Sequence, residues 1–195
     1  YEYQCTDLVL DTNGIGLGVY DFITKEHICQ ENGKRYQAMT CINDKDMAER
    51  CKIRDANKVV WSVKANSTFN NEICVLLRNG IQNGKINFLI SEQEADNSLK
   101  ETYKGYLKMS PTEQAKLKMS YIQTTYAVYE LVKLDHEVKN GNIRVKEVDG
   151  MRKDRYSSIA YSYWCACQLE LKLKPKTQNT ESLVSKLPIR RAKYN

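Results

Sequence analysis

The sequence predicts an α/β domain, because short apolar strands alternate with amphipathic helices along the chain. Three units carry this prediction. In each, an apolar strand leads through a polar turn into a helix, and the strands lie at 6–10, 58–63 and 141–146. The chain has 195 residues, of which 42% are hydrophobic and 28% charged. This length and balance allow one domain with a real core and are not those of a disordered chain.

The first unit delivers an acid to the end of a strand. The apolar run at 6–10 ends at Asp11, and glycines at positions 14, 16 and 18 precede a helix expected from residue 19. Ligands gather at the carboxyl ends of strands in open α/β sheets, and glycines let a backbone turn sharply and approach a ligand closely. The glycine spacing does not match G-x-G-x-x-G, and no G-x-x-x-x-G-K-[ST] occurs, which excludes both nucleotide-binding fingerprints.

The middle of the chain has weaker periodicity. Residues 26–58 are polar and mixed, so we expect a loop region with one short helix. An amphipathic helix should begin at Ser67, since apolar residues recur at spacings of three and four, and the apolar run at 85–90 favours another buried strand. Residues 91–110 are polar and are expected to form a mobile connection.

A long helix and a final strand–helix unit complete the domain. Ser110, Pro111 and Glu113 form a capping-box pattern with proline at the first helical position, which predicts a helix over 111–134. The strand at 141–146 then leads through an Asp-Gly turn into the last helix, whose apolar residues fall roughly on one face.

A cluster of charge marks the start of the last helix. Asp154 stands among three cations, Arg152, Lys153 and Arg155. The helix macrodipole favours a carboxylate in the first turn, so Asp154 fits a solvated helix start. It also fits a metal ligand whose neighbouring cations hold phosphates. A second carboxylate arriving from elsewhere in the chain would decide for the metal.

The net charge of +6 is unevenly placed, because much of the positive charge lies from residue 139 onward. This distribution is compatible with a polyanionic partner. Residues 174–195 hold two of the three prolines and several basic residues, so we expect a loosely attached basic tail on a domain of residues 1–173. The chain does not begin with Met, from which we expect a fragment of a longer protein.

Other classes of site have little support. The seven cysteines are odd in number and show no paired C-x-x-C spacing, which argues against zinc and for reduced thiols. Only two histidines occur, each among charged residues, so a Ser-His-Asp or Cys-His catalytic arrangement is not expected. No apolar run approaches membrane-spanning length, and no membrane partner is expected.

Asp11 and Asp154 have the same predicted position, since each follows a strand or turn and stands at the beginning of a helix. Mg²⁺ prefers hard oxygen ligands such as carboxylates and water. Two such ions about 4 Å apart clamp the attacking and leaving oxygens in phosphodiester hydrolysis, which generally takes at least three acidic groups. Because the chain has 24 acids, this pair alone is weakly specific.

Two motifs resemble the C-terminal nuclease domain of terminase large subunits from tailed phages or prophages. The first, DTNGIGLGVYD, runs from Asp11 to Asp21, and the second, MRKDRYSSIAY, runs from Met151 to Tyr161. The stretch between them is similar as well, and the resemblance spans roughly residues 6–165. The first motif alone would be weak, whereas the pair, in this order and with the right elements between them, is fairly specific.

The resemblance implies a ribonuclease H-like fold, a mixed sheet flanked by helices, with a two-metal site for Mg²⁺ or Mn²⁺. It implies that Asp11 and Asp154 are catalytic metal ligands. It also places Arg152, Lys153 and Arg155 beside Asp154, where they would hold the DNA backbone.

One part of the family pattern is missing. The first catalytic Asp of the family lies on the first strand of a three-strand meander, which should come before residue 1. We therefore expect the chain to lack the first strands of its sheet. Asp149 is a further candidate metal ligand, although its position before Gly150 also fits a turn.

By the same resemblance, the chain would cut concatemeric double-stranded viral DNA during genome packaging. The implied partners are DNA, the ATPase motor domain of the same parent protein, the portal and the small terminase subunit. The implied place is the procapsid in the host cytoplasm. Two alternatives stay open: a non-catalytic ribonuclease H-like module that binds DNA or docks on the portal, and a plain α/β domain in which both acids cap helices.

Overall fold

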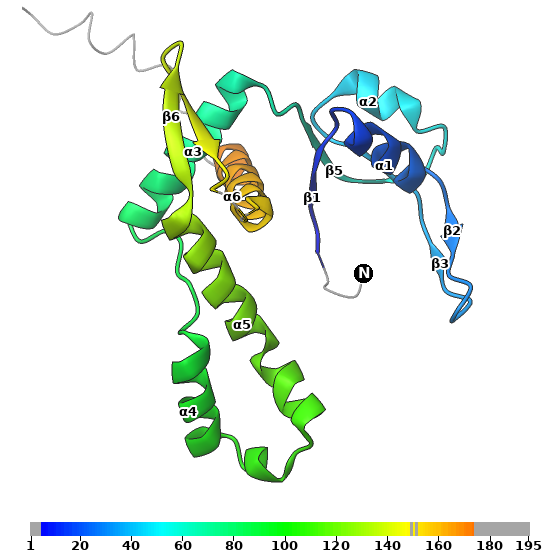
Figure 1. The fold of residues 1–195 in the computed structure, drawn as a ribbon. Helices are drawn as coiled ribbons and strands as arrows, with labels where there is room; N and C mark the ends of the chain where they lie inside the picture. Colours follow the sequence, from blue (N-terminus) through cyan, green and yellow to red (C-terminus); the bar gives the residue numbers. More distant parts are fainter. Residues whose placement is uncertain (1–4, 149, 151, 174–195) are drawn as a thin grey trace, which may run out of the picture.

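The structure, a computed structural model, describes residues 5–148, 150 and 152–173 (Figure 1). The predicted tail at 174–195 and Asp149 lie outside the described residues. The elements, in chain order and with η1 a 3₁₀ helix, are β1 (Leu8–Asp11), α1 (Ile15–Ile23), β2 (His27–Ile28), β3 (Arg35–Tyr36), β4 (Met39–Cys41), α2 (Lys45–Arg50), β5 (Asn57–Val63), α3 (Ser67–Gln82), α4 (Glu92–Thr102), η1 (Tyr106–Lys108), α5 (Pro111–Lys133), β6 (Asp135–Lys139), β7 (Asn142–Lys146) and α6 (Asp154–Leu173).

Strand β5 is the centre of a three-stranded parallel sheet, with β1 on one side and β4 on the other. Asp11 at the end of β1 lies opposite Val63 of β5. The last four residues of β5, 60–63, are all buried, and successive side chains of a strand point to opposite faces. Both faces of the sheet are therefore covered, as expected for parallel strands. The predicted α/β class is confirmed, and the ribonuclease H-like arrangement stays a prediction.

Helices α1 and α2 cover one face of the sheet. Tyr20 of α1 is fully buried there against Cys41, Met47 and Val60. Its hydroxyl donates a hydrogen bond to the carbonyl of Met47 (2.8 Å) and accepts one from the backbone N–H of Cys41 (3.1 Å). This phenol thus links α1 to both α2 and β4.

Helices α3 and α6 provide the second core. Trp61 of β5 meets Trp164 of α6 in an edge-on contact with ring centroids 6.0 Å apart, and Phe69 of α3 lies 5.5 Å from the same Trp164 ring. The two helices approach closely at Gly80, where a Cβ atom would lie 2.5 Å from the ring of Tyr163. The buried members of this core are Ile73, Leu77, Tyr156 and Ala160.

Helices α4 and α5 lie side by side and form an arm that projects from the rest of the chain (Figure 1). Tyr106 in η1, which joins the two helices, is buried, and its hydroxyl donates to Asp96 (2.9 Å). Lys100 and Lys118 form ion pairs with the same carboxylate at 2.5 and 3.2 Å. Asp96 therefore ties both helices and their connection together.

Two predictions for the stretch between α3 and α5 are wrong. Residues 85–90 form no strand. Instead, the side chain of Ile86 packs against the second core. A short apolar run fits such a buried connection as well as it fits a strand. Residues 91–110 were expected to be a mobile connection but contain α4 and η1, because Ser91 and Glu94 form a capping box that starts a helix.

Smaller differences concern element boundaries. The region 26–58 holds β2, β3 and β4 and the start of β5 in addition to the one helix expected there. Helix α1 begins at Ile15, four residues before the expected start at residue 19. Strand β6 was not predicted and pairs antiparallel with β7 in a hairpin. Within the described part of the chain, the helices are all too short or too polar to cross a membrane.

We expect Tyr20→Phe to lower the free energy of unfolding by about 1–3 kcal/mol, because the buried N–H of Cys41 loses its hydrogen-bond acceptor. Urea denaturation followed by circular dichroism measures this change. Tyr129→Phe is the matched control, because the Tyr129 side chain is 54% exposed, and it should leave the free energy within about 0.5 kcal/mol of the wild-type value. Equal effects of the two substitutions would contradict the role assigned to the Tyr20 hydroxyl.

The ion pairs of Asp96 in the arm predict how the stability of the protein depends on pH. Hydrogen bonds from Lys100, and then from Tyr106 and Lys118, lower the pKa of Asp96 from 3.8 to about 2. A carboxylate whose pKa is lowered on folding stabilises the fold above its unfolded pKa, and this contribution is lost as the pH falls through the folded pKa.

We therefore expect Asp96→Asn to melt below the wild-type protein at about pH 5 and the difference to shrink toward zero near pH 2. Thermal melting followed by circular dichroism across this range provides the measurement. A difference in melting temperature that stays constant with pH would show that the ion pairs of Asp96 do not hold the arm.

Candidate functional site

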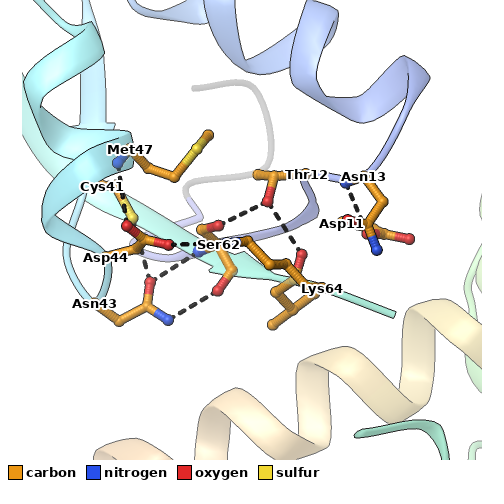
Figure 2. Close-up of polar contacts among 10 residues, drawn as sticks. Asp11, Thr12, Asn13, Cys41, Asn43, Asp44, Met47, Ser62 and Lys64 are labelled. Carbon is orange, nitrogen blue, oxygen red and sulfur yellow. Dashed lines mark hydrogen bonds and ion pairs between the residues drawn. The ribbon is translucent and has the colours of Figure 1, made fainter. Parts of the chain in front are cut away.

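Asp11 lies at the carboxyl end of β1, and two hydrogen bonds fix its side chain there. Its Oδ1 atom accepts hydrogen bonds from the backbone N–H groups of Asn13 (3.1 Å) and Ala65 (3.4 Å). The second of these contacts joins Asp11 to the segment that follows β5. Figure 2 shows Asp11 beside Thr12 and Asn13, where β1 turns toward α1.

Two of the glycines after Asp11, Gly14 and Gly16, shape the turn from β1 into α1. Gly14 has a φ of +55°, a conformation that residues with a side chain rarely adopt. Gly16 lies so close to the end of β1 that a Cβ atom there would stand 1.6 Å from the carbonyl oxygen of Asp11. The close approach anticipated for a ligand is therefore, at Gly16, an approach of α1 to the strand end.

A buried polar network lies next to Asp11 (Figure 2). The hydroxyls of Thr12 and Ser62 share a hydrogen bond of 2.8 Å, and Thr12 also donates to the carbonyl of Val63. The side chain of Asn43 donates to the Ser62 carbonyl and accepts from the Ser62 N–H, both at 2.8 Å. These contacts fasten the ends of β1 and β5 to the connection between β4 and α2. The sequence carried no signal for them, because the partners come from three separate segments.

Two further acids flank this region and have structural partners. Asp21 on α1 accepts two hydrogen bonds from Arg50 of α2, at 2.7 and 2.5 Å. Asp44 caps the start of α2 by accepting from the N–H of Met47 (3.1 Å). Both carboxylates therefore stabilise the helices that cover the first face of the sheet.

Asp154 is the first residue of α6, as predicted, and its side chain is exposed. Its carboxylate makes no hydrogen bond or ion pair with any residue that the structure describes. It borders an open hollow of about 680 Å³ lined by α5, α6 and the segment after α3, with polar groups from Asn87, Gln123 and Ser158. This carboxylate is thus available to a cation or another partner from outside the described chain.

The three neighbouring cations differ in their surroundings. Arg155 lies 3.6 Å from Glu130, donates to Gln123 at 3.4 Å and stacks over the ring of Tyr126 at 5.3 Å. Lys153 donates to a backbone carbonyl of β7 at 3.4 Å. Arg152 is exposed. Two of the three predicted DNA-binding residues therefore have partners within the chain, and their contact with DNA stays a prediction.

Glu130 is a notable residue that the sequence did not single out. It is only 4% exposed, and its Oε1 atom accepts the backbone N–H of Tyr156 in the first turn of α6 (2.7 Å). The signal for it was an acid on the apolar face of α5, three residues after the buried Ala127. Such a position calls for a buried partner, but the sequence does not tell which one.

Strand β1 packs against α6, and this contact relates Asp11 to Asp154. Burial, followed by the negative charge of Asp11, raises the pKa of the Tyr161 phenol on α6. Tyr161 follows Asp154 by seven residues, roughly 10 Å along a helix. Strand β1 therefore meets α6, and Tyr161, whose pKa responds to Asp11, lies about two turns beyond Asp154.

The described residues contain no group of three His, Cys, Asp or Glu side chains placed to hold a metal ion. Asp149, the further candidate ligand, lies outside the described residues. A cation shared by Asp11 and Asp154 therefore stays a prediction.

Comparison of the chain with protein-family models, with curated proteins and with solved structures finds no match.

Gly16 and Gly18 provide a matched pair of substitutions within α1. We expect Gly16→Ala to destabilise the protein by about 1–3 kcal/mol, because the new methyl group overlaps the Asp11 carbonyl. Gly18→Ala should instead stabilise it by about 0.5–1 kcal/mol, because a Cβ atom there meets nothing within 4 Å and alanine favours the helix. Urea denaturation measures both, and a stabilising Gly16→Ala would contradict the close approach.

Proposed function

We propose that the chain is a metal-dependent endonuclease domain that cuts concatemeric double-stranded viral DNA during genome packaging. The observation that carries the proposal is the packing of β1 on α6, since it draws together the two elements that bear Asp11 and Asp154. Of the two sequence motifs that resemble terminase nucleases, the first begins at the end of β1 and continues into α1, and the second continues into α6.

The donor atoms fit Mg²⁺ or Mn²⁺. Both ions favour carboxylate oxygens, and the carboxylate of Asp154 is free of partners among the described residues. At Asp11 the two backbone contacts go to Oδ1, which leaves Oδ2 for a cation. Bound there, a divalent ion would stabilise charge on the phosphate and activate water for attack. A complete two-metal site needs at least one more acid, for which Asp149 is a candidate.

The basic residues beside Asp154 fit a phosphate-rich substrate. Arg152 is exposed and has the position to contact a DNA backbone that approaches Asp154. Arg155 has five N–H donors, and its contacts with Glu130 and Gln123 leave some of them for a phosphate. We assign the remaining partners with the function: the ATPase motor of the same parent protein, the portal and the small terminase subunit, at the procapsid.

We expect Asp154→Ala in the full-length protein to lower Mn²⁺-dependent cleavage of supercoiled plasmid by more than about 100-fold. Even the outer-shell partners of a bound metal contribute 10–100-fold, and Asp154 is a proposed direct ligand. Because the side chain is exposed, the melting temperature should stay unchanged. Asp55→Ala, which removes another exposed carboxylate, is the control and should cleave at the wild-type rate.

The same assay separates the proposal from its alternative. A protein that binds duplex DNA with salt-dependent affinity, but cleaves none with Mg²⁺ or Mn²⁺, is a non-catalytic module that binds DNA or docks on the portal. Normal cleavage by Asp154→Ala would remove Asp154 from the site and the endonuclease assignment with it.

A further inference from the structure

The carboxylate of Glu130 is buried on α5 and is directed at the start of α6. Its side chain is 5% exposed, its Oε1 atom accepts the N–H of Tyr156 at 2.7 Å, and its Oε2 atom lies 3.6 Å from Arg155. A buried carboxylate is costly unless it is paired and hydrogen-bonded, and here both partners belong to the first turn of one helix. The placement of Glu130 is therefore tied to the placement of that turn.

The contact between Glu130 and Tyr156 satisfies a backbone N–H group at the start of α6. The first N–H groups of a helix have no partner within the helix, and a nearby side-chain oxygen can take their place. Glu130 supplies this oxygen from 26 residues away along the chain. Its negative charge also suits the positive end of the helix macrodipole.

Arg155 adds a second connection between the same two helices. It contacts Gln123, Tyr126 and Glu130, which are spaced by three and four residues and so lie along one face of α5. Residue 155 is thus held by three side chains, and residue 156 by one of them. Asp154, which precedes both, has no partner of its own among the described residues.

From this geometry we infer that Glu130 is a positioning residue, which fixes the first turn of α6 and thereby the carboxylate of Asp154. The inference rests on the proposed function wherever it concerns cleavage, and on the Glu130–Tyr156 contact wherever it concerns the helix. Glu130 itself contacts neither metal nor DNA in this role.

The experiment compares Glu130→Ala and Glu130→Gln with Glu113→Ala in the full-length protein. Glu113 is the matched control, because it too is a carboxylate on α5 that caps the start of a helix. It accepts the Ser110 N–H at 2.9 Å, at the other end of α5 from Glu130. Glutamine keeps an oxygen for the Tyr156 N–H and removes the charge opposite Arg155. If Glu130→Ala does not fold, the comparison of Glu130→Gln with the wild-type protein tests the inference.

Two quantities are measured below the melting temperature of every variant. Amide hydrogen exchange at Tyr156 should accelerate by about tenfold or more in Glu130→Ala, less in Glu130→Gln, and stay at the wild-type rate in Glu113→Ala. The kcat for plasmid cleavage should fall by about 10–100-fold in Glu130→Ala, the range typical for residues that orient metal ligands, with the KM for DNA little changed. Glu113→Ala should keep the wild-type kcat.

The outcomes separate this inference from the proposed function. Unchanged exchange at Tyr156 in Glu130→Ala overturns the inference, whatever the enzyme does. Faster exchange with unchanged cleavage also overturns it, because the first turn would then not need Glu130 to present Asp154. If the wild-type protein cleaves no DNA, the proposed function is lost, and the exchange rates still decide whether Glu130 holds the first turn of α6.

Discussion

Burial of β5 on both faces sets the positions of the other elements. Val60 packs with Tyr20 beneath α1 and α2, while Trp61 meets Trp164 of α6 on the opposite side. A shift in the register of β5 by one residue would exchange these two sets of side chains, so the register is strongly fixed. Asp11 pairs with Val63 in that register and is therefore fixed at the end of the sheet.

The strand ends gain further order from polar contacts. Thr12 and Ser62 are both 6% exposed, and Asn43 satisfies the backbone of Ser62 on both its N–H and its carbonyl. Buried polar groups whose hydrogen bonds are all made specify one arrangement of the chain. Asp11 thus stands on rigid backbone, whereas the carboxylate of Asp154 depends on how the first turn of α6 is held.

The sequence predicted those parts of the fold that depend on local signals. The capping box at Ser110 placed the start of α5 correctly, and the apolar run ending at Val63 identified β5. Local signals failed at 85–90, where an apolar run proved to be a buried connection. They also failed at β6, because its residues 135–139 are mostly charged and exposed and so lack an apolar face.

The candidate site was predictable only in part. The placement of Asp154 at the start of a helix followed from the local sequence, and the structure agrees. Glu130 could not be assigned a partner, because its contact with Tyr156 joins two helices that are separated by a hairpin. Tertiary contacts of this kind leave no periodic pattern in a single sequence.

Helix α5 connects the projecting arm to the candidate site without a break. Its 23 residues extend roughly 35 Å, and from Lys118, which pairs with Asp96 of the arm, to Glu130 the helix rises about 18 Å. An unbroken helix of this length is stiff, so its two ends move together. Because Glu130 lies on this helix, a rigid displacement of its tip near η1 would also displace the carboxylate that caps α6.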